Sequence, residues 1–176
     1  MRIYLLGFMG SGKTTIGQQL ARRLGYAFED LDDLIERKYK TSIPLIFEKY
    51  DEQAFRNLET EVLHLTAGFE NAVVATGGGT PCYFNNMEWM NKNGLTIYLK
   101  MHAGSLTRRI INAKKVRPLI RSKSPEEVLH FVELKLGERE SFYEQAHIVI
   151  HGEVVDMDEI ARSIDQYQKL NNHGYL

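Results

Sequence analysis

Short apolar runs alternate along the chain with longer segments in which apolar residues recur every three or four positions. The short runs end at glycines or acidic residues, as buried strands do, and the longer segments have the spacing of amphipathic helices. Five runs predict strands, at residues 2–8, 26–32, 71–79, 95–101 and 147–152. Helices are predicted at residues 14–25, 33–40, 42–69, 87–94, 105–113, 124–146 and 157–170.

Residues that open or close helices support these boundaries, and they are Gly25, Ser42, Pro44, Ser124 and Pro125. The long helical region is expected to break near Tyr50 and Asp51. Strands that alternate with helices predict a parallel sheet covered on both faces. We therefore expect an α/β three-layer sandwich with a five-stranded parallel sheet, built as one domain over residues 1–176.

Composition narrows the class of protein. Hydrophobic residues make up 43% and charged residues 26%, as in ordinary globular domains, and the net charge of -1 does not favour a nucleic-acid or membrane partner. The one cysteine, Cys82, excludes an intramolecular disulfide and fits a reducing compartment. No apolar run approaches the roughly 20 residues of a membrane span. We expect a cytoplasmic protein.

The most specific motif is "GFMGSGKTT", which follows the first predicted strand and opens the first predicted helix. It matches the G-x-x-x-x-G-K-[ST] pattern, whose backbone N–H groups cradle phosphates. In that pattern Lys13 reaches the outer phosphates and the Thr14 hydroxyl binds Mg²⁺. The segment predicts a binding site for a nucleoside triphosphate, made by Gly7, Gly10, Ser11, Gly12, Lys13, Thr14 and Thr15.

Acidic residues follow the second predicted strand in "EDLDD". Asp30 and Asp32 alternate along an extended chain, so we expect them on one face, near the phosphate loop. One would hold Mg²⁺ through water while the other meets an acceptor hydroxyl. For Asp33 alone we favour a cap on the following helix.

A second glycine run, "TGGGTP", follows the third predicted strand. Consecutive glycines cost backbone entropy, so they indicate a place where backbone closely approaches a ligand. A flexible turn is the alternative. Thr76, just before the run, is a candidate to hydrogen-bond a metal-bound water.

Together, the segments "GFMGSGKTTIG", "DLD", "FRNLE", "ATGGGT", "RPLI" and "RESFYEQA" strongly resemble the shikimate kinase family, from Arg2 to about Ile164. The resemblance implies a P-loop kinase fold of the nucleoside-monophosphate-kinase type, with a mobile lid at about residues 112–124. It also implies ATP-dependent phosphorylation of shikimate at its 3-hydroxyl, a step towards chorismate and the aromatic amino acids, with Mg²⁺ as cofactor.

The resemblance assigns roles to individual residues. Asp30 organises the water shell of Mg²⁺ together with Thr14, and Asp32 contacts the acceptor hydroxyls and acts as the base. The acceptor carboxylate and its pocket are assigned to Arg56, Arg139, Gly77, Gly78 and Gly79. Arg117 is the lid arginine on the phosphates, and Arg109 lies against the adenine.

Elementary chemistry is consistent with these roles, although solvated charges remain the alternative. A carboxylate acceptor suits guanidinium groups, which bind it bidentately, and Glu59 is placed one turn after Arg56 to orient it. Arg139 stands between two glutamates, where a surface ion pair is the simpler interpretation. Five cations between Lys114 and Lys123 suit closure over a triphosphate, and a basic solvated loop is the alternative.

Two other functions stay open at this point. A kinase of another small hydroxy acid, such as gluconate, would share the fold, and a nucleotide-binding regulatory module would share the phosphate loop. "FRNLE" with "TGGGT" favours shikimate, and the pair Asp30 and Asp32 favours an enzyme. The fifth predicted strand and the residues after it read "HIVIHGEVVD", which departs from the family's usual adenine loop and leaves the contacts there unassigned. We expect a monomer.

Overall fold

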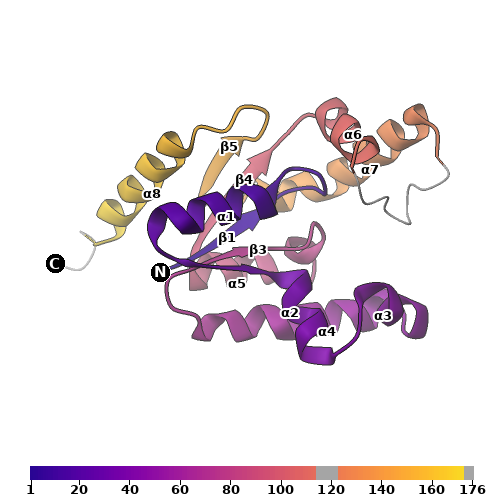
Figure 1. The fold of residues 1–176 in the computed structure, drawn as a ribbon, viewed down its shortest axis with the longest axis horizontal. Helices are drawn as coiled ribbons and strands as arrows, with labels where there is room; N and C mark the ends of the chain where they lie inside the picture. The colour runs from indigo at the N-terminus through magenta and orange to yellow at the C-terminus, as the bar shows by residue number, and fades with distance from the viewer. Residues whose placement is uncertain (114–122, 173–176) are drawn as a thin grey trace.

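The computed structural model describes residues 1–113 and 123–172 (Figure 1). Five parallel strands form one sheet in the order β2-β3-β1-β4-β5. The strands are β1 (Arg2–Leu6), β2 (Ala27–Asp30), β3 (Ala72–Ala75), β4 (Leu95–Lys100) and β5 (Ile148–His151). The predicted five-stranded parallel α/β fold is confirmed. Arg117 and most of the predicted lid lie outside the described residues.

Eight α-helices are assigned in the described ranges (Figure 1). They are α1 (Lys13–Leu24), α2 (Leu31–Tyr39), α3 (Ile43–Lys49), α4 (Glu52–Leu65), α5 (Asn86–Asn93), α6 (Ala103–Ile111), α7 (Pro125–Tyr143) and α8 (Met157–Asn172). Short 3-10 turns follow α4 at Thr66–Gly68 and follow the glycine run at Thr80–Cys82. The long helical region breaks at Tyr50 and Asp51, as predicted.

The period of two in β1 divides the core into two layers. Ile3 and Leu5 pack in one apolar cluster with residues of α1 and α8. Tyr4 and Leu6 pack in another with residues of α2, α4 and α5. A third cluster, around Phe8, joins the phosphate-loop region to α6 and α7. The sheet is therefore the middle layer of the predicted sandwich.

Local signals account for several helix ends. Gly25 closes α1 in the left-handed region, with φ of 68°, where a glycine avoids the steric cost of a side chain. The Ser124 hydroxyl accepts from the backbone N–H of Glu127, and the Glu127 carboxylate accepts from that of Ser124, so α7 begins with a capping box. Ser42 occupies the cap position of α3 without a side-chain hydrogen bond.

The chain around the acidic segment differs from the prediction. The strand ends at Asp30, whose carboxylate accepts from the backbone N–H of Asp32 at 3.1 Å and caps α2. The expectation that Asp30 and Asp32 alternate along an extended chain is therefore wrong, because Asp32 lies in the first helical turn. The expectation that Asp33 caps this helix is also wrong. An Asp at the cap satisfies otherwise unpaired N–H groups, and this local bond ends the strand earlier.

Candidate active site at the carboxyl ends of the strands

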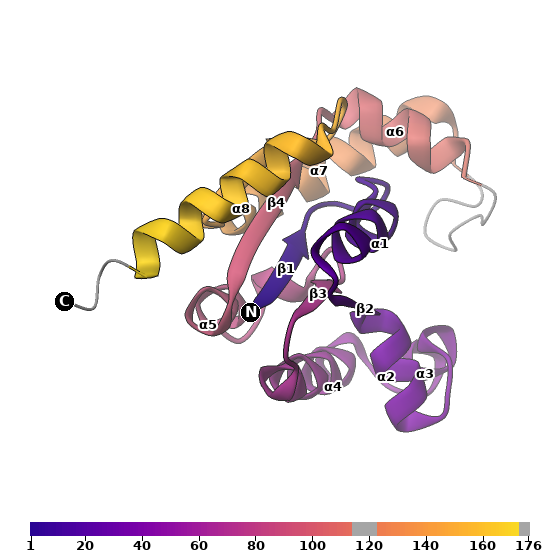
Figure 2. The ribbon, with the colours of Figure 1, turned by 60° about the vertical axis from the view of Figure 1, so that its left-hand side comes forward.

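The segments predicted to carry chemistry meet at one edge of the sheet. The phosphate loop follows β1, the acidic segment follows β2, and the glycine run follows β3, so all three lie at the carboxyl ends of neighbouring strands. Figures 1 and 2 show α2, α3 and α4 grouped on one side of the phosphate loop, with α6 and the start of α7 on the other. Ligands of parallel α/β sheets bind at such an edge.

The phosphate loop needs its glycines for backbone geometry. Gly7, Gly10 and Gly12 have φ angles of 146°, 82° and 93°, in a region that side chains rarely adopt. The Lys13 ammonium donates to the carbonyl oxygens of Gly7 at 2.7 Å and Phe8 at 3.0 Å. The loop is thus held in a compact turn by its own lysine.

Thr14 and Asp30 lie together beside this loop. The Thr14 hydroxyl donates to the Asp30 carboxylate at 3.0 Å, across the gap between α1 and the end of β2. One hydroxyl and one carboxylate are a donor set that suits Mg²⁺, which keeps several waters and takes its other ligands from phosphates. No cluster of three or more His, Cys, Asp or Glu suited to a metal occurs in the described parts of the chain.

Arg109 of α6 lies on the outer side of the phosphate loop. Its guanidinium donates to the carbonyl oxygens of Ser11 at 3.3 Å and Gly152 at 3.2 Å, so it connects the loop to the segment after β5. A hollow of about 450 Å³ opens beside it, lined by Met101, Ser105, Arg108, Arg109, Asn112 and Glu153. This position, next to the predicted phosphate site, can accommodate a base.

Arg56 of α4 is buried in a network of acids, and only 8% of the residue is exposed. Its guanidinium donates to Glu59 at 2.8 Å and to Glu52 at 3.1 Å, and Glu59 also accepts from the Thr80 hydroxyl at 2.6 Å. Burial lowers the pKa of Arg56, but the charges and hydrogen bonds of Glu59 and Glu52 outweigh it, so the pKa is raised. Arg56 is therefore a permanently charged, fixed guanidinium.

An aromatic residue that the sequence did not single out completes this network. The Tyr83 ring lies over the Arg56 guanidinium, with 4.4 Å between the guanidinium carbon and the ring centroid. The Tyr83 hydroxyl donates to Glu52 at 3.1 Å. Glu52 could have been found from its place one helical turn before Arg56. The contact of Tyr83 had no sequence signal, because it depends on how the turn after β3 folds onto α4.

The glycine run packs against the residues predicted to bind the acceptor. A Cβ added to Gly79 would lie 2.7 Å from the Arg56 guanidinium, and one added to Gly77 would lie 2.7 Å from Glu59 and 3.5 Å from Asp32. A Cβ on Gly78 would lie 3.4 Å from Arg139. Side chains cannot be accommodated at Gly77 and Gly79 without shifts, so the run brings both arginines and Asp32 around one short stretch of backbone.

Arg139 of α7 has a different environment from Arg56. Its guanidinium carbon lies 5.6 Å from the centroid of the Phe8 ring, in cation–π contact with the phosphate-loop region. Within the described residues, Arg139 has no carboxylate partner within ion-pair distance. Its flanking glutamates bind lysines instead, Glu138 with Lys135 and Glu140 with Lys100. The simpler interpretation of Arg139 as part of a surface ion pair is therefore wrong.

Two candidate residues have structural roles. Thr76 is buried, and its hydroxyl donates to the Leu5 carbonyl at 3.1 Å, so it joins β3 to β1. Its contact with a metal-bound water stays a prediction. Burial raises the pKa of the Cys82 thiol to about 11, an effect that Arg139 and Arg56 partly offset. A thiol that stays protonated suits a packing role for Cys82.

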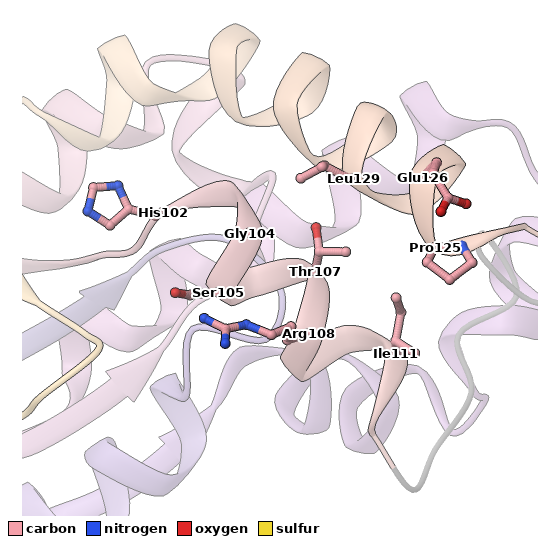
Figure 3. Close-up of a pocket in the computed structure, with 9 residues that line it drawn as sticks. All are labelled: His102, Gly104, Ser105, Thr107, Arg108, Ile111, Pro125, Glu126 and Leu129. Carbon is pink, nitrogen blue, oxygen red and sulfur yellow. The ribbon is translucent and has the colours of Figure 1, made fainter.

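A further hollow of about 560 Å³ lies between α6 and the start of α7 (Figure 3). The residues around it include Thr107, Ile111, Pro125 and Leu129. None of the predicted site residues in the described ranges lines this hollow. The candidate site is therefore the edge of the sheet and not this groove.

Comparison with known proteins supports a definite family. The family model for shikimate kinase matches residues 9–168 of the chain. A shikimate kinase of Azobacteroides pseudotrichonymphae is 48% identical over 164 residues, which cover 93% of this chain and 96% of that protein. A shikimate kinase of Bacteroides thetaiotaomicron is 41% identical over 171 residues, which cover 97% of this chain and 98% of that protein.

Solved structures agree with these sequence matches. The crystal structure of shikimate kinase from Bacteroides thetaiotaomicron has a TM-score of 0.86 at 40% identity, with 98% of each chain covered. Shikimate kinase from Acinetobacter baumannii, solved in complex with shikimate, has a TM-score of 0.80 at 38% identity and covers 97% of this chain and 93% of that one. A gluconokinase from Sinorhizobium meliloti has a TM-score of 0.61 at 15% identity, and that likeness shows the fold alone.

Proposed function

The chain belongs to the shikimate kinase family, and from its site we propose which residues carry each part of the ATP-dependent phosphorylation of shikimate. The product is shikimate 3-phosphate, an intermediate on the way to chorismate and the aromatic amino acids. The observation that carries the residue assignment is the packing of Arg56, Arg139 and Asp32 around the glycine run, next to the phosphate loop.

Arg56 and Arg139 bind the carboxylate of shikimate, and Gly77, Gly78 and Gly79 form the backbone wall of the same pocket. Two guanidinium groups on opposite sides of a carboxylate give charge-assisted bonds that fix its orientation as well as its affinity. The ion pair with Glu59 supports this role, because it holds Arg56 in place while Arg139 has no competing carboxylate in the described parts of the chain. The pocket thus selects an anionic acceptor.

ATP occupies the phosphate loop, with its phosphates on the N–H groups of Gly10, Ser11, Gly12, Lys13, Thr14 and Thr15. Lys13 exchanges its two carbonyl partners for phosphate oxygens. Arg109 flanks the base, as its place beside the loop and Gly152 suggests. Arg117, which lies outside the described residues, is proposed from the family resemblance to reach the phosphates as part of a lid at about residues 112–124.

Thr14 and Asp30 are proposed to hold Mg²⁺, Thr14 directly and Asp30 through water. The 3.0 Å contact between their oxygens supports this assignment, because one site then presents both donors. When bound, the ion neutralises part of the charge that builds up on the phosphates during transfer.

Asp32 acts on the acceptor hydroxyl. The 3-hydroxyl oxygen attacks the γ-phosphorus of ATP, the new O–P bond forms, and the bond to the bridging oxygen of ADP breaks. The hydroxyl proton passes to the Asp32 carboxylate, and Lys13 stabilises the negative charge on the transferring group. Phosphoryl transfer requires little covalent chemistry from a protein, so positioning and charge provide most of the catalysis.

The test is a coupled ADP-release assay with shikimate, with gluconate and other hydroxy acids, and without an acceptor. We expect shikimate alone to give rapid release, because the two arginines select its carboxylate geometry. Faster ADP release with gluconate than with shikimate would favour a kinase of another hydroxy acid. ADP release at the same rate with and without any acceptor would favour a nucleotide-binding regulatory module.

Four broader expectations belong to the same proposal. The whole chain works as one P-loop kinase domain, as a monomer, and in the cytoplasm, without a nucleic-acid or membrane partner. None of the helices in the described ranges has the length and hydropathy that a membrane span requires. Light scattering after size exclusion tests the monomer, and fractionation of expressing cells tests the location.

A further inference from the structure

Tyr143, the last residue of α7, bonds to the middle of the glycine run. The side chain is fully buried, and its hydroxyl donates to the carbonyl oxygen of Gly78. These residues are 65 positions apart in sequence. Tyr143 also follows Arg139 by one helical turn, so the same stretch of α7 carries a predicted acceptor arginine and a bond to the pocket wall.

Gly78 lies against both the proposed acceptor arginine and the phosphate loop. A Cβ on this residue would lie 3.4 Å from the Arg139 guanidinium, 3.5 Å from the Met9 backbone nitrogen and 3.6 Å from the Gly7 carbonyl oxygen. A shift of Gly78 would therefore change the pocket wall, the contact with Arg139 and the contact with the phosphate loop together. Its only hydrogen bond from a side chain in the described residues comes from Tyr143.

The state of the Tyr143 hydroxyl fits a fixed donor. Burial raises the pKa of Tyr143, and the nearby positive charge of Arg139 offsets only part of the effect. The hydroxyl thus stays protonated at neutral pH and can donate to the Gly78 carbonyl. A partly buried carbonyl that lost this donor would lose its hydrogen bond from the protein, which is unfavourable, and the glycine backbone would adjust easily.

We propose that Tyr143 is a positioning residue, whose hydroxyl holds the glycine run in register with Arg139 and the phosphate loop. It does not touch the substrate itself. The inference rests on the proposed acceptor site. It adds that Tyr143 of α7, by holding Gly78, fixes the distance between the bound acceptor and the phosphate donor. Misplacement of reacting groups by even 1 Å can cost about 10²-fold in rate, so the hydroxyl should affect turnover.

The test compares Tyr143→Phe with a matched control, Tyr98→Phe. The Tyr98 ring is buried and lies 5.0 Å from the Tyr143 ring, but its hydroxyl has no hydrogen-bond partner in the described residues. Both variants remove one buried hydroxyl from the same aromatic pair, and only one of them releases Gly78. Melting temperatures with and without an ATP analogue show that each variant folds and binds nucleotide.

We expect Tyr143→Phe to lower kcat/KM for shikimate by roughly 5- to 50-fold, with a raised KM for shikimate and a nearly unchanged KM for ATP. Tyr98→Phe should stay within about twofold of the wild type. Equal kinetics for the two variants, with only the melting temperature lowered in Tyr143→Phe, would overturn the inference, because the bond would then be structural alone. A loss of ATP binding in Tyr143→Phe would also overturn it.

Arg139→Ala separates this inference from the proposed acceptor site. If Arg139→Ala leaves the KM for shikimate unchanged, the acceptor site itself is wrong. If Arg139→Ala raises that KM and Tyr143→Phe behaves like Tyr98→Phe, the acceptor site stands and the positioning role of Tyr143 fails.

Discussion

The acceptor side and the nucleotide side of the site hold their cations in different ways. On the acceptor side, Arg56 is bound by Glu59 and Glu52 and covered by the Tyr83 ring. On the nucleotide side, the Lys13 ammonium is bound to carbonyl oxygens of its own loop. Arg56 thus has a buried carboxylate as a permanent partner, whereas the Lys13 ammonium bonds to carbonyl oxygens that phosphate can replace.

This difference indicates that the acceptor pocket is organised before any ligand binds. Breaking a buried ion pair by removing one partner costs about 3–5 kcal/mol, so Arg56 should keep Glu59 in every state. Lys13 gains by exchange, because bonds from an ammonium to phosphate are charge-assisted and stronger than bonds to carbonyls. The nucleotide side should therefore change on binding more than the acceptor side does.

The largest expected effect is at Asp32, where the two sides meet beside Gly77. Asp32→Asn should lower turnover by about 10²–10⁴, the range for loss of a general base, while ATP still binds. The matched control is Asp33→Asn, an exposed acid in the same helical turn, which should leave turnover within about twofold. Steady-state kinetics measure both. A change confined to ATP affinity in Asp32→Asn would move Asp32 to the nucleotide side and exchange its role with that of Asp30.

The next largest effect is expected at Lys13, because phosphate can replace the carbonyl oxygens that its ammonium binds. Lys13→Ala should lower turnover by about 10²–10³, the usual size of a lost electrostatic stabiliser. It should also abolish most of the rise in melting temperature that an ATP analogue gives the wild type, because binding to the folded state is what raises it. Calorimetry with and without the analogue checks this. Near-normal turnover would remove Lys13 from the mechanism and end the contrast with Arg56.

Motifs with local geometry could be predicted from the sequence, and contacts made by tertiary packing could not. The glycine pattern of the phosphate loop requires its own backbone angles, so its position between β1 and α1 followed directly. Asp30 was misplaced on a common strand face with Asp32, because a bond from one side chain to the backbone two residues on was enough to start the helix. Tyr143 lies 65 residues from its partner Gly78, and Tyr83 lies 27–31 residues from its partners in α4. No local sequence pattern indicates contacts between residues so far apart.

Substitution of the two arginines of the acceptor side should have different effects on the stability of the fold, although both substitutions should raise the KM for shikimate. Arg56→Ala leaves the buried Glu59 carboxylate without its cation, so it should destabilise the fold by about 3–5 kcal/mol. Arg139→Ala removes a cation–π contact with Phe8 and breaks no buried ion pair of the described residues, so it should cost about 1 kcal/mol or less. Urea unfolding measures the difference. Each variant should raise the KM for shikimate by roughly 10- to 100-fold, as expected for loss of a charge-assisted bond.

Equal destabilisation by the two substitutions would contradict the view that Arg56 alone is held by a buried pair. A loss of ATP affinity in Arg139→Ala would show that this arginine serves the phosphates rather than the acceptor. Double substitution tests whether both bind one carboxylate, since residues that share a ligand should not have additive effects on binding.

The smallest effect concerns His147, which lies outside both sides of the site. Its ring nitrogen Nδ1 accepts from the backbone N–H of Thr96 at 3.2 Å, which requires an unprotonated Nδ1. Burial lowers the pKa of His147 below its usual 6.5. Above that value the imidazole is neutral in the folded and unfolded chains, and stability is independent of this group. As the pH falls below 6.5, the unfolded chain takes up the proton first, so stability falls.

His147→Gln should remove this part of the pH slope, measured as urea midpoints between pH 7 and pH 5, and should leave both KM values at pH 7 unchanged. A kinetic change in this variant would mean that the contrast between the two sides reflects the stability of the whole sheet rather than the contacts of Arg56 and Lys13.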